Sequence, residues 1–135
     1  MIKKLTKTIF SAEFYFFAIV GSAGFLVDYS VFSILHCKFD YELSRALSIF
    51  TAASFNWLAN RTITFKVEKR ATHIEWLKYL SVSAVAAAIN FSVFIALTRI
   101  SPLMKEFFVI PMALATGVSM WFNFFCSKFY VFSKK

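Results

Sequence analysis

Four segments of the chain are apolar over the length that an α-helix needs to cross a lipid bilayer. Such a helix takes roughly 20 consecutive residues, and no irregular backbone is tolerated against lipid. The composition agrees, because 59% of the residues are hydrophobic and 20% are aromatic, well above the apolar share of a soluble domain. No small-residue cleavage site follows the first segment, so we interpret it as a retained helix. We predict an all-α membrane protein with four transmembrane helices, at residues 14–35, 43–65, 76–97 and 107–132.

The loops between these segments and the placement of basic residues predict the topology. The connections are about seven, ten and nine residues long, so consecutive helices should be antiparallel neighbours. Of the 15 Lys and Arg residues, only Lys38, Arg45, Arg99 and Lys105 fall on one side of the membrane. Cytoplasmic loops carry the excess of Lys and Arg, so both termini and the central connection should be cytoplasmic. That side carries Lys3, Lys4, Lys7, Arg61, Lys66, Lys69, Arg70, Lys78, Lys128, Lys134 and Lys135.

The sequence contains no arrangement of residues that is typical of a catalytic or metal site. Cys37 and Cys126 belong to no CxxC pair, and His36 and His73 have no partner at metal-ligand spacing. There is no Ser/His/Asp or Cys/His arrangement and no Gly-rich phosphate loop. We therefore expect no enzyme activity, no cofactor and no metal. The formal net charge of +8 is distributed between the apolar segments, which indicates membrane lipids and not nucleic acid as partners.

The two halves of the chain resemble each other. Residues 28–32 (DYSVF) align with 90–94 (NFSVF), and residues 55–61 (FNWLANR) align with 122–128 (FNFFCSK). Two spans return the chain to its starting side, so the copies should be parallel repeats, two helical hairpins related by a pseudo-twofold axis along the membrane normal. We expect one membrane domain over 1–135, with repeat one at about 14–65, the cytoplasmic connection at about 66–75 and repeat two at about 76–132.

The repeats differ in their charged residues. Asp28 aligns with Asn90, and Arg45 aligns with Met112. The first repeat kept the charges, so we expect it to be the half that is specialised for a ligand, with the second half supporting the packing.

One motif at the end of the second segment resembles the GtrA family of small membrane proteins. It has the form Phe-Asn-x-x-x-Asn-Arg-x-x-Thr-Phe, over residues 55–65, after a Gly-containing first helix with Asp28, and a degenerate copy ends the fourth segment. The resemblance covers residues 14–132. It implies a protein of the bacterial inner membrane that moves polyprenyl-phosphate-linked sugars across the bilayer, or that assists the glycosyltransferases that make or use them.

Asp28 is the residue in the apolar segments that most requires an explanation. A charged side chain there costs about 2.5 to 3.5 kcal/mol on insertion scales, so it should face protein. Gly21, Gly24 and Asp28 share one helix face, where small residues allow a second helix to approach closely. Asp28 and Arg45 both fall near the outer ends of their helices, and we predict that they can pair. A polar stripe on the second helix comprises Arg45, Ser48, Ala52, Asn56 and Asn60.

These polar residues have a structural and a functional interpretation. In the first, Asp28 and Arg45 are a structural ion pair, and the asparagines form interhelical hydrogen bonds of about 0.6 kcal/mol each. In the second, they form a polar path for a phosphosugar head group, because hydroxyls need carboxylate and amide partners and a phosphodiester needs cations. The predicted head-group residues are Asp28, Arg45, Asn56, Asn60, Arg61, Asn90, Asn123 and Lys128.

Two further groups have competing interpretations. Arg61 and Lys128 should lie at the cytoplasmic ends of their helices, where they can bind the incoming phosphate or extend to phospholipid phosphates. Trp57 and Trp121 can stack on a sugar face or serve as interface anchors and packing, as can Trp76.

The hypothesis is therefore translocation, or flipping, of a polyprenyl-phosphate-linked monosaccharide from the cytoplasmic to the outer leaflet, for glycosylation of cell-surface polysaccharide. The alternative is a non-transporting accessory or scaffold subunit of a membrane glycosyltransferase, and a third interpretation is a small drug or ion transporter. Four short helices enclose little volume. We therefore expect a homodimer or a complex with a membrane glycosyltransferase.

Overall fold

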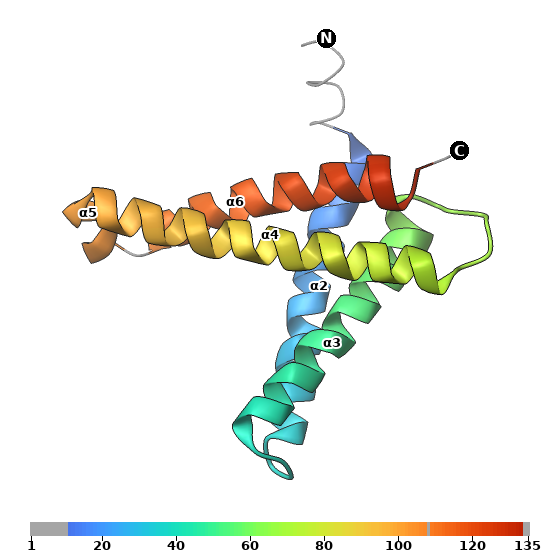
Figure 1. Ribbon diagram of the computed structural model, residues 1–135, viewed down its shortest axis with the longest axis horizontal. Helices are drawn as coiled ribbons and strands as arrows, with labels where there is room; N and C mark the ends of the chain where they lie inside the picture. The colour runs from blue at the N-terminus through green and yellow to red at the C-terminus, as the bar shows by residue number, and fades with distance from the viewer. Residues whose placement is uncertain (1–10, 108, 134–135) are drawn as a thin grey trace. The chain divides into compact units, whose positions relative to one another are not determined.

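The computed structural model describes residues 11–107 and 109–133, and these residues form helices and no strand (Figure 1). The prediction of an all-α protein is confirmed. Lys3, Lys4, Lys7, Lys134 and Lys135, which the topology prediction uses, lie outside the described residues. In chain order the elements are α2 (Ala12–Leu35), α3 (Tyr41–Ala59), the π-helix η1 (Asn60–Thr64), α4 (His73–Ile100), α5 (Pro102–Glu106), α6 (Val109–Cys126) and the π-helix η2 (Ser127–Val131).

Three of the described helical segments are long and apolar enough to cross a membrane. They are Ala12–Leu35, His73–Ile100 and Val109–Val131, as expected of a multi-pass membrane protein. The predicted fourth span, on α3, is not confirmed by this criterion. The structure forms this helix, but its mean hydropathy is too low for the criterion. The residues that lower it are Glu42, Arg45 and several residues with hydroxyl side chains.

The chain divides into two compact units, and the division falls between Trp76 and Leu77. In the first unit α2 and α3 pack against each other as a hairpin, drawn in blue and green in Figure 1. Asp40 begins α3 because its carboxylate accepts a hydrogen bond from the backbone N–H of Leu43 at 2.9 Å. At the other end of the hairpin the Phe17 ring packs on Phe65, with 6.2 Å between ring centroids.

The first hairpin ends in a π-helical turn followed by a strained residue. The backbone N–H of Phe65 donates to Asn60 O at 2.9 Å, and that of Val67 donates to Arg61 O at 2.9 Å. Between them Lys66 has a φ of 48°, and it is the one described non-glycine residue with a positive φ. Left-handed backbone is costly for a residue with a Cβ and favours glycine.

Lys66→Gly should therefore stabilise the protein. We expect the free energy of unfolding to rise by up to about 1 kcal/mol, the lower end of the cost of a strained backbone conformation. The measurement is unfolding of the purified protein in mixed micelles. The matched control is Glu68→Gly, two residues further along the same loop, which should give no gain. A lower stability for Lys66→Gly than for the unsubstituted protein would contradict this reading of the turn.

In the second unit α4 and α6 form an antiparallel pair, and the short helix α5 lies in the connection between them (Figure 1). The side-chain amide of Asn90 donates to Ser119 Oγ at 3.2 Å and to Thr116 Oγ1 at 3.4 Å, which links α4 to α6. The Tyr79 ring packs on Phe132, with 5.9 Å between centroids. These contacts join α4 to α6 and to the residue that follows η2.

Most of the residues that the two units bury occupy aligned positions. The buried residues of α2, Phe17, Val20 and Gly24, align with the buried residues Tyr79, Val82 and Ala86 of α4, at the offset that aligns Asp28 with Asn90. In the returning helices Ser44, Ser48 and Ala52 align with the buried residues Pro111, Ala115 and Ser119. The π-helices η1 and η2 also align, and so do the ring pairs Phe17–Phe65 and Tyr79–Phe132.

Candidate functional site

The predicted pairing of Asp28 with Arg45 is confirmed. Arg45 Nη1 donates to Asp28 Oδ2 at 2.7 Å, and this ion pair joins α2 to the second turn of α3. The Asp28 side chain is 16% exposed and that of Arg45 is 45% exposed, so the guanidinium remains accessible beside an enclosed carboxylate. The guanidinium also lies over the Phe32 ring, 6.0 Å from its centroid. A cation and an anion are thus held together between α2, which is long and apolar enough to cross a membrane, and α3.

Three buried oxygens of the α2–α3 hairpin have no hydrogen-bond partner within the described part of the chain. They are Asp28 Oδ1, Ser44 Oγ and Asn56 Oδ1, which we call the unpartnered oxygens. Buried polar atoms are nearly always satisfied in native proteins, and each exception needs a reason, such as a ligand that supplies the missing donor. Asp28 Oδ1 and Asn56 Oδ1 accept only, so a group with hydroxyls is the complement that they lack.

Gly24 makes room for Asn56. A Cβ at Gly24 would overlap the oxygen, nitrogen and Cγ of the Asn56 side chain, whereas one at Gly21 would meet nothing within 4 Å. The small residue therefore lets α3 place an amide directly against α2, one helical turn from Asp28.

Gly24→Ala is expected to displace Asn56 and to destabilise the hairpin by about 1–3 kcal/mol, the usual cost of overpacking. Unfolding in mixed micelles measures this. Gly21→Ala, on the same helix, should be neutral or slightly stabilising, and Gly24→Ala combined with Asn56→Ala should recover part of the loss. If Gly24→Ala and Gly21→Ala behave alike, the close approach is not important for stability.

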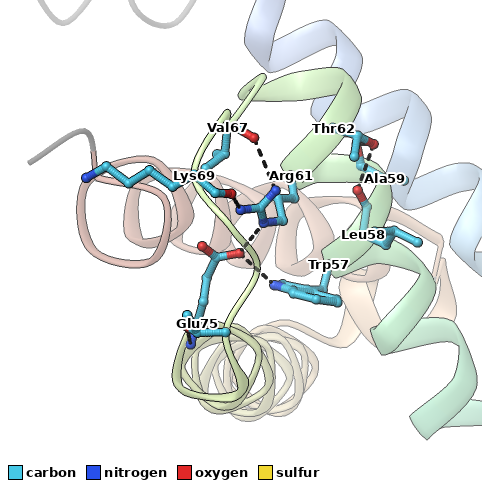
Figure 2. A network of polar contacts seen from close by, with 9 residues as sticks. Trp57, Leu58, Ala59, Arg61, Thr62, Val67, Lys69 and Glu75 are labelled. Carbon is cyan, nitrogen blue, oxygen red and sulfur yellow. Dashed lines mark hydrogen bonds and ion pairs between the residues drawn. The ribbon is translucent and has the colours of Figure 1, made fainter.

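A second polar centre lies at the opposite end of α3, and Figure 2 shows it. Arg61 Nε donates to Glu75 Oε1 at 2.7 Å, and the Trp57 indole N–H donates to the same oxygen at 3.2 Å. The other guanidinium nitrogens of Arg61 donate to the backbone carbonyls of Val67, at 3.1 Å, and of Lys69. We call this group, Trp57, Arg61 and Glu75 with the two carbonyls, the Arg61 cluster. It fastens the end of the hairpin, the loop and the start of α4 together.

Local sequence explains how Glu75 reaches this position. Thr72 Oγ1 accepts the backbone N–H of Glu75 at 3.1 Å, the first half of a capping box. The Glu75 carboxylate turns to Arg61 and Trp57. Sequence reasoning missed Glu75 as a site residue, and the Thr-x-x-Glu spacing was the signal that could have found it.

Arg61 is enclosed more than a phosphate ligand at a helix end would be. Its side chain is 8% exposed, and all three of its side-chain nitrogens donate to protein acceptors. Direct phosphate binding by Arg61 stays a prediction, and the geometry favours a positioning role. Asn60, 1% exposed, is also internal, and its Oδ1 accepts a hydrogen bond from Thr64 Oγ1 at 2.8 Å.

The two polar centres of the first unit are separate. Arg45 and Arg61 are sixteen residues apart, which is roughly 24 Å along a helix. The structure therefore joins Asp28 with Arg45, and Trp57 with Arg61, but it does not join these pairs with each other. The predicted stripe on α3 leads from one centre to the other through Asn56.

The predicted site residues of the second unit are engaged within that unit. Asn90 donates to Ser119 and Thr116, and Asn123 Oδ1 accepts from Ser127 Oγ at 3.3 Å. The Lys128 ammonium lies over two rings, 5.8 Å from Phe124 and 5.9 Å from Phe129. Trp121 stacks on Phe125 with 5.7 Å between centroids, so this indole contributes to an aromatic cluster. At the positions that align with Asp28 and Arg45, this unit has the uncharged residues Asn90 and Met112.

The fold and these polar centres define a small, multi-pass, all-helical membrane protein with charged and amide side chains held between its helices. The chain belongs to the GtrA/DPMS transmembrane domain family, which it matches over residues 16–132. The resemblance seen in the motif of residues 55–65 is thus confirmed. Domains of this family are associated with the handling of polyprenyl-phosphate sugars. No similar sequence was found among curated proteins.

Proposed function

We propose that this protein moves a polyprenyl-phosphate-linked monosaccharide from the cytoplasmic to the outer leaflet of the bacterial inner membrane. The observation that carries the proposal is the set of unpartnered oxygens on the α2–α3 hairpin, together with the accessible guanidinium of Arg45 that contacts Asp28. A sugar phosphate is complementary to that set, because its hydroxyls donate to buried acceptors and its phosphodiester needs a cation. We propose no catalytic step for the protein itself.

In this mechanism the polyprenyl chain stays in lipid while the head group follows the polar face of α3. Sugar hydroxyls donate to Asp28 Oδ1 and Asn56 Oδ1, which replaces the hydrogen bonds to water that the sugar loses. The phosphate approaches Arg45, whose guanidinium is partly exposed and can hold two phosphate oxygens at once. Both contacts lower the cost of placing a polar head group at membrane depth.

The proposal includes α3 as a fourth crossing and the two units as copies of one hairpin. In this proposal the polar residues of α3 face α2 and a ligand. The low mean hydropathy of α3 is therefore compatible with a helix that crosses the membrane within a bundle. The aligned buried positions, π-helical ends and ring pairs support the repeat. With two crossings per copy and basic residues concentrated in the central connection, both termini and that connection would be cytoplasmic.

The proposal also includes an assembly. Many large apolar side chains of both units are exposed, among them Phe25, Tyr29, Phe91 and Phe129. Most of these would contact lipid, and a second copy or a membrane glycosyltransferase would complete the enclosure of a sugar that one hairpin cannot surround. The partner's active site would supply or use the lipid-linked sugar.

The test is reconstitution of the purified protein alone in liposomes with a fluorescent polyprenyl-phosphate hexose. Access of a membrane-impermeant quencher to the probe reports its leaflet. We expect movement between leaflets that is faster than in protein-free liposomes and that is selective for the sugar-bearing lipid. If the protein alone moves nothing but raises product formation by a co-reconstituted glycosyltransferase, the accessory role is the correct one.

A further inference from the structure

A cavity of about 340 Å³ lies in the first unit beside the Arg61 cluster. It is lined by Trp57, Ala71, Thr72, His73 and Trp76, which come from the end of α3, the loop and the start of α4. Its volume is at the lower end of the range of about 300–1,000 Å³ for small-molecule sites. The indole rings of Trp57 and Trp76 in this lining have no role in the translocation mechanism proposed above.

Both tryptophans are held by their indole nitrogens. The Trp57 N–H donates to Glu75 Oε1 at 3.2 Å, and the Trp76 N–H donates to Ser54 Oγ at 3.2 Å. The Trp76 ring also meets the Phe50 ring edge-on, with 5.4 Å between centroids. The indoles are therefore oriented before any ligand arrives, which reduces the entropy that a ligand must overcome.

The chemistry of the lining favours a sugar over a phosphate. None of the described residues that line the cavity is Lys or Arg, so a phosphate would find no cation there. Indole faces carry a negative partial charge, and the C–H groups on a pyranose face are their complement. His73 and Thr72, both exposed at the rim, can bond to hydroxyls.

We infer that this cavity binds the hexose ring of the lipid-linked sugar where it first meets the protein, with the phosphate and polyprenyl chain outside. This inference rests on the proposed function and adds a sugar subsite to it. Arg61 acts here as a positioning residue, because it holds the Glu75 carboxylate to which the Trp57 indole is bonded (Figure 2). The motif Arg is thereby connected to sugar recognition and not to the phosphate.

The experiment measures binding by isothermal titration of the intact protein in micelles. The probes are a short-chain isoprenyl-phosphate hexose and the same isoprenyl phosphate without sugar. We expect the unsubstituted protein to bind the sugar-bearing probe at least about tenfold more tightly, a difference that aromatic stacking can supply. Trp57→Leu and Trp76→Leu should each remove most of this preference and leave the affinity for the sugar-free probe unchanged. Trp121→Leu, in the second unit, is the matched control and should keep the preference.

Two milder variants extend the test. His73→Ala changes only an exposed residue at the rim of the cavity, and it should lower the affinity for the sugar-bearing probe a fewfold. Arg61→Lys keeps the charge but cannot hold Glu75 and two carbonyls together, so it should reduce the sugar preference alone. If Arg61 instead binds the phosphate directly, both probes should lose affinity equally, and its positioning role is then wrong.

The outcomes separate this inference from the proposed function. If Trp57→Leu and Trp76→Leu keep the full sugar preference while the unsubstituted protein translocates in liposomes, the sugar binds elsewhere and the proposed function stands. If those variants lose the preference but the unsubstituted protein moves no lipid, the cavity is a sugar site and translocation is wrong.

Discussion

Arg61→Ala is expected to lower the free energy of unfolding by about 3–5 kcal/mol, the cost of removing one partner from a buried ion pair. The substitution leaves the Glu75 carboxylate, 14% exposed, without its cation. It also removes the donors to the carbonyls of Val67 and Lys69, which hold the loop after η1. The measurement is equilibrium unfolding in mixed micelles.

Lys128→Ala is the matched control for that prediction, because Lys128 is the aligned cation of the second unit. Its ammonium lies over the Phe124 and Phe129 rings, and a cation–π contact contributes about 0.5–1 kcal/mol at accessible sites. Glu75→Gln should cost more than Lys128→Ala, because it leaves the Arg61 charge enclosed and uncompensated. Equal losses for Arg61→Ala and Lys128→Ala would show that the Arg61 cluster does not hold the unit together.

The features that were predictable from the sequence are those that the membrane itself imposes. A run of about 20 apolar residues has to be helical in lipid, so the long helices followed from length alone. A carboxylate in such a run has to find a partner, and Arg45 was the cation at a similar depth on the next helix. The same argument could not settle α3, because a helix that hides polar residues against a neighbour resembles a surface helix in hydropathy.

The features that were not predictable depend on loop conformation and side-chain direction. Glu75 follows the loop after Arg61, and their contact requires the π-helical turn and the left-handed Lys66 that bring the chain back. Gly24 was recognised as a small residue, but the side chain that fills its space, Asn56, follows from the packing of α3 on α2. The short helix α5 and the π-helix η1 are each only 5 residues long. Elements of this length are too short to produce a periodic hydrophobic pattern in the sequence.

Replacing both members of the charge pair, as Asp28→Asn with Arg45→Met, should nearly abolish translocation while the protein stays folded. These are the residues at the aligned positions of the second unit, Asn90 and Met112, so each fits the same kind of helix position. No charge is left uncompensated, and replacing an enclosed pair by neutral residues is often neutral for stability. The head group loses two contacts to charged groups, which contribute about 1.5–3 kcal/mol each, so each loss should lower the rate roughly tenfold to hundredfold.

The variant pair separates a functional from a structural role, because the two roles predict opposite patterns. For a structural ion pair, Asp28→Asn alone and Arg45→Met alone should both destabilise the protein, and the double variant should recover stability and transport together. For a head-group site, the double variant should recover stability in mixed micelles but not the liposome rate, because the negative charge of Asp28 and the Arg45 guanidinium are both gone. If the double variant transports at the unsubstituted rate, Asp28 and Arg45 do not contact the head group during translocation. The head-group contacts would then be those of Asn56 and of the cavity lined by Trp57 and Trp76.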